Sequence, residues 1–157
     1  MTNRQRQVAN VEVDQSGRFE DTRVDTVLAL ANGIRYAIRI PAQIKRTCLK
    51  VLRQRGKKGA ALYLSLFSAA LLLLLRPWGQ QLGIVTIDIE YEGHEAEIKA
   101  RLLRLAWRHG LRLSSGQLTF RLIGKQSRAH QTALGVFRGQ RLADVTIKAQ
   151  DLLRLAK

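Results

Sequence analysis

The segment from Gly59 to Leu75 constrains the fold most, because GAALYLSLFSAALLLLL carries no charged residue. A helix that crosses a bilayer needs about 20 mostly apolar residues, whereas this segment is shorter and contains Ser65 and Ser68. A helix that is apolar on every side is stable in water only when other elements surround it. We therefore predict a helix buried in the core of a folded domain rather than a membrane span.

The residues before this segment predict three strands and a basic helix. VANVEVDQSG, residues 8–17, alternates valines with acids and then breaks at a Ser-Gly pair, as a strand followed by a turn does. The Asn32-Gly33 pair is a strong hairpin signal and separates apolar runs that predict strands near 25–31 and 34–40. In the residues that follow, apolar and basic side chains recur on separate stripes at helical spacing, which predicts a basic amphipathic helix.

The second half of the chain predicts two further strands and two helices. IVTIDIEY, residues 84–91, alternates strictly and predicts a strand with Asp88 and Glu90 on one face. The remaining elements are a helix at 94–110, a strand at 117–124 and a short helix capped by Ser127. The tail at 142–148 fits either a strand followed by a helix or one helix entered at Asp144.

Together these elements predict an α/β fold with a mixed five-stranded sheet flanked by helices. The hairpin is antiparallel, whereas strands separated by helices favour parallel pairing, so the sheet is mixed. A chain of 157 residues can build one domain with its own core, which we place at 1–157, with 1–7 flexible. The single cysteine, Cys48, excludes an internal disulfide, and the absence of an apolar signal segment favours a cytoplasmic location.

Basic residues dominate the charge, because 27 lysines and arginines against 12 acids give a formal net charge of +15. No acid lies between Asp25 and Asp88, so the many basic residues there have no local counter-charge. Such an excess favours nucleic acid, because lysine and arginine displace counterions from phosphates. A solubility face, or contacts to a ribosome or anionic lipid, is the alternative. The residues expected to contact nucleic acid are Arg46, Lys50, Arg53, Lys57, Lys58, Lys125 and Arg128.

The acids gather in two places against this background. Five lie between positions 12 and 25, including Asp14, and five lie between positions 88 and 97, including Asp88 and Glu90. Phosphodiester hydrolysis requires an activated water and a leaving group beside a charged phosphate, and divalent cations held by carboxylates stabilise both. Acids on neighbouring strands supply that geometry. We therefore expect a hard divalent cation as the cofactor, with the acids holding the metal and the bases holding the nucleic acid.

Three short motifs carry a family resemblance: VEVDQSG with Asp14, IDIEYEG with Asp88 or Glu90, and the late SRAH and LAD segments. With the order of elements, they resemble the ribonuclease H-like superfamily, and within it the RuvC-type Holliday junction resolvases. The resemblance implies that a first-strand aspartate and a fourth-strand acid, adjacent in the sheet, join a late acid or histidine to hold Mg²⁺ or Mn²⁺. His130 and Asp144 match the late positions. The family usually has another acid close to its late histidine, and SRAHQTALG has none.

Each candidate residue has a structural alternative. Asp14 could cap the turn after its strand, and Asp88 and Glu90 could be solvated positions at a sheet edge. Glu90 is favoured over Asp88 as a metal ligand because it lies closer to the carboxyl end of the predicted strand. His130 could be a packed or surface residue, and Asp144 could be a helix cap.

Two functions follow from these residues. The first is a metal-dependent nuclease that hydrolyses structured nucleic acid, either branched DNA such as a Holliday junction or an RNA-containing duplex. The second is a non-catalytic basic nucleic-acid-binding protein of the same fold, in which the acid set is incomplete. The resemblance implies a homodimer, for which the leucine run at 71–75 offers an apolar interface. Trp78 and Trp107 are expected to pack in the core rather than stack on bases.

Overall fold

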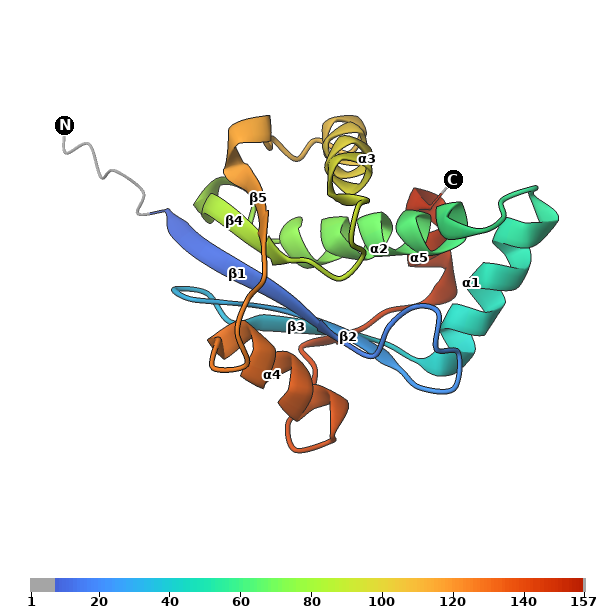
Figure 1. Ribbon diagram of the computed structural model, residues 1–157, viewed down its shortest axis with the longest axis horizontal. Helices are drawn as coiled ribbons and strands as arrows, with labels where there is room; N and C mark the ends of the chain where they lie inside the picture. The colour runs from blue at the N-terminus through green and yellow to red at the C-terminus, as the bar shows by residue number, and fades with distance from the viewer. Residues whose placement is uncertain (1–7, 157) are drawn as a thin grey trace.

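The three N-terminal strands form an antiparallel meander in the computed structural model, which describes residues 8–156 (Figure 1). Strand β1 (Ala9–Ser16) pairs with β2 (Thr26–Ala31), and β2 pairs with β3 (Tyr36–Ile40). Between β2 and β3, Asn32 and Gly33 each have a φ of 81°, which asparagine and glycine tolerate best. The predicted hairpin is therefore confirmed. The predicted flexibility of 1–7 lies outside the described residues.

Three parallel strands complete the sheet. Strand β4 (Leu82–Asp88) lies beside β1, β5 (Leu118–Arg121) beside β4, and β6 (Val145–Thr146) beside β3, which gives the order β5-β4-β1-β2-β3-β6. The mixed α/β sheet is confirmed, but the prediction of five strands is wrong. The tail adds the two-residue β6 before helix α5 (Ala149–Leu155), which decides the open alternative at 142–148 in favour of a strand followed by a helix.

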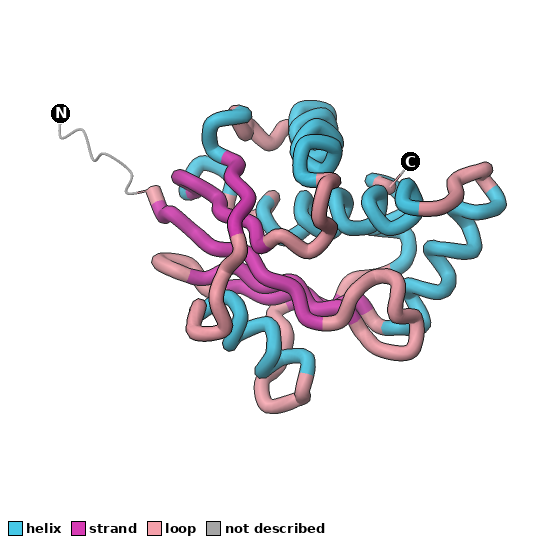
Figure 2. The backbone as a smooth tube through the Cα atoms, viewed as in Figure 1, coloured by secondary structure: helices cyan, strands magenta, loops and turns pink. Residues whose placement is uncertain are grey.

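The helices cover the two faces of the sheet unequally (Figures 1 and 2). One face carries α1 (Ala42–Gln54), α2 (Ala60–Leu75), α3 (Glu95–Arg108) and α5, and the other carries α4 (Arg128–Phe137) alone. Short 3-10 helices, η1 (Gly79–Gln81) and η2 (Ser115–Gln117), lead into β4 and β5. The side of the sheet that carries α4 is therefore left partly uncovered, which allows polar side chains to stand on it.

The alternation of strand residues fits these two layers. Val13 of β1 and Ile87 of β4 belong to the large core beneath α1, α2, α3 and α5. Ala29 of β2 and Ala37 of β3 point the other way and pack against Ala133 and Val136 of α4. Small side chains at this contact let α4 approach the sheet closely, which brings its first turn near β1.

Helix α2 is the central helix of the large layer, and every residue from Leu64 to Leu75 is buried. The predicted core helix is thus confirmed. Along the stretch that the structure describes, no helix combines the length and apolar character required to cross a bilayer. The leucines at 71–75 are at most 8% exposed, because the same chain covers them. They therefore supply no surface for the dimer interface that was expected there.

Ser127 caps α4 as predicted, because its Oγ accepts hydrogen bonds from the amides of Ala129 at 3.1 Å and His130 at 3.3 Å. Ser127→Ala removes the acceptor for both amides, so we expect it to lower the free energy of unfolding by about 1 kcal/mol. Urea denaturation measures this change, with Ser115→Ala at an exposed serine as the control. A Ser127→Ala protein as stable as wild type would contradict a stabilising role for the cap.

Candidate metal centre

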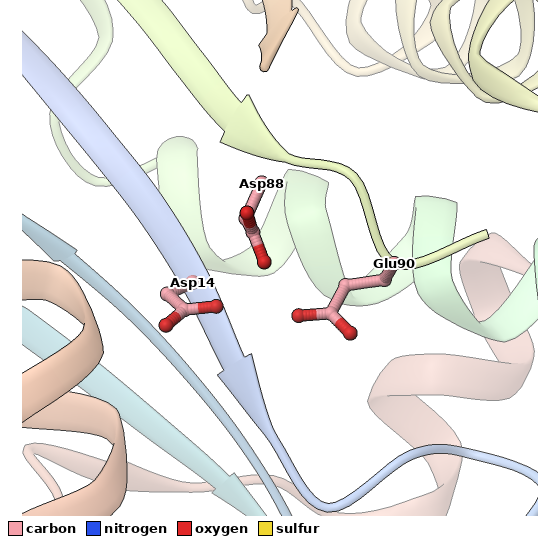
Figure 3. Close-up of side chains that lie close together, drawn as sticks. All are labelled: Asp14, Asp88 and Glu90. Carbon is pink, nitrogen blue, oxygen red and sulfur yellow. The ribbon is translucent and has the colours of Figure 1, made fainter. Parts of the chain in front are cut away.

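Strands β1 and β4 bring two aspartates side by side. The strands are parallel, with Val13 opposite Ile87, so the next residues, Asp14 and Asp88, are neighbours near the carboxyl ends of both strands. Glu90 follows in the loop after β4, and its carboxylate points toward both aspartates (Figure 3). Ligand oxygens from the three residues lie within 4.8 Å of one another. These are the three residues that the sequence suggested as metal ligands.

Glu90 lies beyond the strand in which it was expected. The predicted strand covered 84–91, whereas β4 begins at Leu82 and ends at Asp88. The amide of Ile89 still donates to the Arg121 carbonyl at 3.1 Å, and after this residue the chain leaves the sheet. The prediction that Glu90 belongs to the strand is therefore wrong. Its place in the loop lets the longer glutamate side chain reach the two aspartates.

Asp14 is held firmly, because its side chain is only 3% exposed and both of its oxygens have partners. Oδ1 accepts a hydrogen bond from the Gln15 amide at 2.8 Å, and Oδ2 lies 2.7 Å from Nδ1 of His130. A buried carboxylate accepts hydrogen bonds, so Nδ1 of His130 is the nitrogen that carries a proton here. The tautomer follows from this pairing.

His130 reaches Asp14 from the opposite side of the sheet to the large core. It lies in the first turn of α4, which Ser127 caps and which packs on β2 through small residues. Its side chain is 25% exposed, so it borders both the acids and the solvent. The structure thus brings His130 into contact with Asp14, as the late position of the motif suggested, and its side chain is partly buried.

Burial and repulsion between like charges raise the pKa values of two acids in the cluster. Burial raises the pKa of Asp88, and the negative charge of Asp14 raises it further. The hydrogen bond that the Ile123 amide donates to Asp88 Oδ1, at 2.7 Å, acts in the opposite direction and lowers this pKa. Burial is also the main cause that raises the pKa of Glu90 to about 8, followed by the charges of Asp14 and Asp88. Three carboxylates this close require a shared proton or a cation.

Two arginines border the acids and were not predicted from the sequence. Arg18 donates to the Glu90 backbone carbonyl, and its guanidinium lies 5.1 Å from the centre of the Tyr91 ring. Arg121 lies directly opposite Asp88 in the β4–β5 pairing and is exposed. The signal for Arg121 was its place within the strand predicted at 117–124, but only the register of β5 against β4 shows which acid it accompanies.

Asp144 is not brought to the acid cluster. Its Oδ2 accepts a hydrogen bond from the Ala37 amide at 2.8 Å, and its own amide donates to the Ala37 carbonyl at 2.9 Å. β2 and β3 therefore lie between Asp144 and the strand that carries Asp14. Both expectations for Asp144, as a catalytic residue and as a helix cap, are corrected. It attaches the tail to the edge of β3 where β6 begins.

The predicted basic residues fall into two groups. Arg46, Lys50, Arg53 and Lys58 are exposed on α1 and the turn after it, and Lys57 is half-buried in that turn. Lys125 and Arg128 are exposed at the start of α4, close in sequence to His130. The second group lies on the side of the sheet that carries the acids. Beside it, Arg35, Arg128 and Arg141 line a hollow of about 570 Å³ between α4 and the β2–β3 turn.

No protein-family model, curated protein or solved structure matches this chain. The donor set itself indicates which ion the site fits. Three carboxylates offer hard oxygen ligands, which suit Mg²⁺ or Mn²⁺, and Cys48 lies on the buried face of α1, outside the acid cluster.

Proposed function

We propose that this protein is a divalent-metal-dependent nuclease of ribonuclease H-like fold that hydrolyses structured nucleic acid. The observation that carries the proposal is the convergence of Asp14, Asp88 and Glu90 on one point of a strongly basic protein. Carboxylates that repel one another are costly to bury unless they bind a cation. A basic surface around them favours a polyanionic substrate.

The arrangement of the sheet supports the fold assignment within this proposal. The first-strand acid Asp14 and the fourth-strand acid Asp88 are adjacent in a parallel pair, as the resemblance implies. The late helix contributes His130, which contacts Asp14 directly. The additional late acid is missing, because α4 consists of RAHQTALGVF. Glu90, in the loop after β4, supplies a third carboxylate in its place.

The residues of this chain have distinct roles in the proposed reaction. Asp14, Asp88 and Glu90 would hold Mg²⁺ or Mn²⁺, whose chemistry is to lower the pKa of a bound water and to neutralise phosphate charge. His130 keeps Asp14 oriented, and the Ile123 amide does the same for Asp88. Arg121, Lys125 and Arg128 are placed to hold phosphates on the exposed side of the sheet.

The direct test is cleavage of four labelled substrates: a four-way DNA junction, an RNA/DNA hybrid, duplex DNA and single-stranded DNA. Each is incubated with Mg²⁺, with Mn²⁺ and with a chelator. We expect cleavage only with metal, and the substrate that is cut decides between branched DNA and an RNA-containing duplex. Tight binding without cleavage of any substrate would favour the non-catalytic binding protein instead.

His130→Gln tests the orienting role of the histidine. Glutamine can still approach Asp14, but it does not hold the carboxylate as the imidazole does at 2.7 Å. We expect Mg²⁺ affinity and cleavage rate to fall by about tenfold, in the range known for residues that orient metal ligands. Titration of Mg²⁺ in the cleavage assay measures both quantities. His109→Gln, at an exposed histidine after α3, is the control and should match wild type.

A further inference from the structure

A second polar hollow lies within the large helical layer, on the opposite face of the sheet from the acid cluster. It has a volume of about 270 Å³ and opens between α2, α3 and the end of α5. The residues that line it are Ser65, Ser68, Arg101, Arg104, Leu105, Arg108, Leu155 and Ala156. Its lining therefore combines three arginines and two serines, a donor-rich set inside an otherwise apolar layer.

The positive charge of this hollow is not balanced. Arg101, Arg104 and Arg108 follow one another at helical spacing on the same stripe of α3, and all three reach the hollow. Lys57 adds a fourth positive charge, because its Nζ donates to Ser65 Oγ at 3.1 Å. Glu97 pairs with Arg101 at 3.0 Å. Among residues 8–156, the carboxylate paired with one of these four cations is that of Glu97, which leaves an excess of positive charge that favours an anion.

The two serines carry hydroxyl protons that have no assigned acceptor. Ser65 Oγ accepts hydrogen bonds from both Lys57 and Arg101, so its own proton is left to donate elsewhere. Ser68 is fully buried, and within residues 8–156 its Oγ has no hydrogen-bond partner. A buried hydroxyl without a partner costs about 1–3 kcal/mol, so its presence on the wall of a cationic hollow requires an explanation.

We propose that this hollow binds a phosphate-bearing anion with at least two negative charges. Phosphate oxygens accept from guanidinium groups in pairs and also accept from hydroxyls, so one ligand would satisfy Arg104, Arg108 and both serines. Burial and the nearby Arg101 charge also lower the pKa of Lys57, which is the response of a cation crowded by others. The size of the hollow suits one or two phosphate groups rather than a large ligand.

This site is independent of the proposed nuclease. The three acids are grouped around Asp14, which contacts His130 of α4, and α4 lies on the opposite face of the sheet from the helices that line the hollow. The anion is recognised by arginines and hydroxyls, not through a divalent cation. Binding can therefore be measured with a chelator present, when the acid cluster is free of metal. A failure of one proposal leaves the other untouched.

Isothermal titration calorimetry with inorganic pyrophosphate, in EDTA at constant ionic strength, tests the proposal. We expect one saturable site per chain. Ser68→Ala removes a buried hydroxyl that has no internal partner, so this variant should be at least as stable as wild type. It should bind pyrophosphate about tenfold more weakly, because a hydrogen bond to a charged group is lost. Arg104→Gln, at an exposed position, should weaken binding by a similar factor of about ten.

Two controls and a competition make the outcome decisive. Arg112→Gln removes an exposed arginine outside the hollow, and Asp14→Asn changes the acid cluster, so both should bind as wild type does. The competition compares a 5′-phosphorylated oligonucleotide with its 5′-hydroxyl counterpart. If only the phosphorylated oligonucleotide displaces pyrophosphate, the ligand is a nucleic-acid end. If neither oligonucleotide displaces it, the ligand is a free anion. The proposal fails if binding is not saturable, or if Arg112→Gln weakens it as much as Ser68→Ala does.

Discussion

Asp14→Asn is expected to reduce metal-dependent cleavage by at least about 10³-fold, since metal stabilisation of a phosphoryl transition state contributes several kcal/mol. Asp14 is the most buried of the three acids and lies between Asp88 and His130. Asparagine has nearly the same shape and can still accept the Gln15 amide, so the fold should be kept. The change removes one negative charge from the centre of the ligand set.

The matched control is Glu12→Gln, which makes the same kind of change on the same face of the same strand. Glu12 accepts a hydrogen bond from Asn32 at 2.9 Å and lies outside the acid cluster. We expect its cleavage rate to stay within about twofold of wild type, as for changes away from the reacting groups. Thermal melting with and without Mn²⁺ gives a second measurement, because a ligand that binds the folded state stabilises it. Stabilisation by Mn²⁺ that persists in Asp14→Asn would place the metal elsewhere.

The affinity for Mg²⁺ is expected to rise about tenfold for each pH unit up to about pH 8, because one proton on Glu90 must leave before the cation binds. Between pH 6 and pH 8 this amounts to about 100-fold. Above that pH the curve should flatten, since the carboxylate is already ionised. A Mg²⁺ affinity that does not change over this range would show that Glu90 is not a ligand.

The same proton makes the metal-free protein sensitive to pH in a defined direction. The pKa of Glu90 is raised from 4.5 to about 8, so between these values the folded state binds more protons than the unfolded state does. This contribution to stability is present below pH 4.5 and is lost as the pH rises through about 8. Glu90→Gln should remove this loss, and saturating Mg²⁺ should offset it in wild type.

Urea denaturation of wild type and Glu90→Gln in EDTA, from pH 5 to pH 9, measures the difference. Buried Lys45 also titrates, because burial lowers its pKa to about 8 while its Nζ donates to the Arg18 and Asp21 carbonyls. Lys45 has the opposite effect on stability, because the unfolded state binds more protons than the folded state between about pH 8 and 10.5. Over that range Lys45 makes the free energy of unfolding rise with pH. Because wild type and Glu90→Gln both contain Lys45, the difference between their unfolding free energies does not include the contribution of Lys45. Parallel pH profiles for both proteins would contradict the raised pKa of Glu90.

Most elements were predictable because the apolar pattern along each of them has one dominant period. The alternation in β1 and the Asn32-Gly33 turn need only local information, and so does the Ser127 cap. The sequence left β6 as one of two alternatives, because the choice depends on Asp144 meeting Ala37, which is far away in sequence. Trp107 was placed in the core but is 84% exposed, since α3 buries a stripe that excludes it.

The candidate site was predictable in its chemistry but not in its contacts. Acids on the first and fourth strands suggested Asp14, Asp88 and Glu90, and the parallel β1–β4 pair brings them within 4.8 Å. The contact between His130 and Asp14 depends on how α4 docks on the sheet, which no local pattern encodes. The neighbouring Arg121 depends on the register of β5 in the same way.

The burial of helix α2 from Leu64 to Leu75 has a consequence for how this protein is made. The ribosome releases α2 well before α3 and α5, whose side chains complete its covering. A nascent chain at that stage presents a leucine-rich surface to solvent, and such surfaces bind chaperones or associate with one another. The apolar surface of α2 is therefore fully covered only after α5 has been synthesised. A stop codon placed before Ala149 would yield a fragment that aggregates rather than a smaller folded domain.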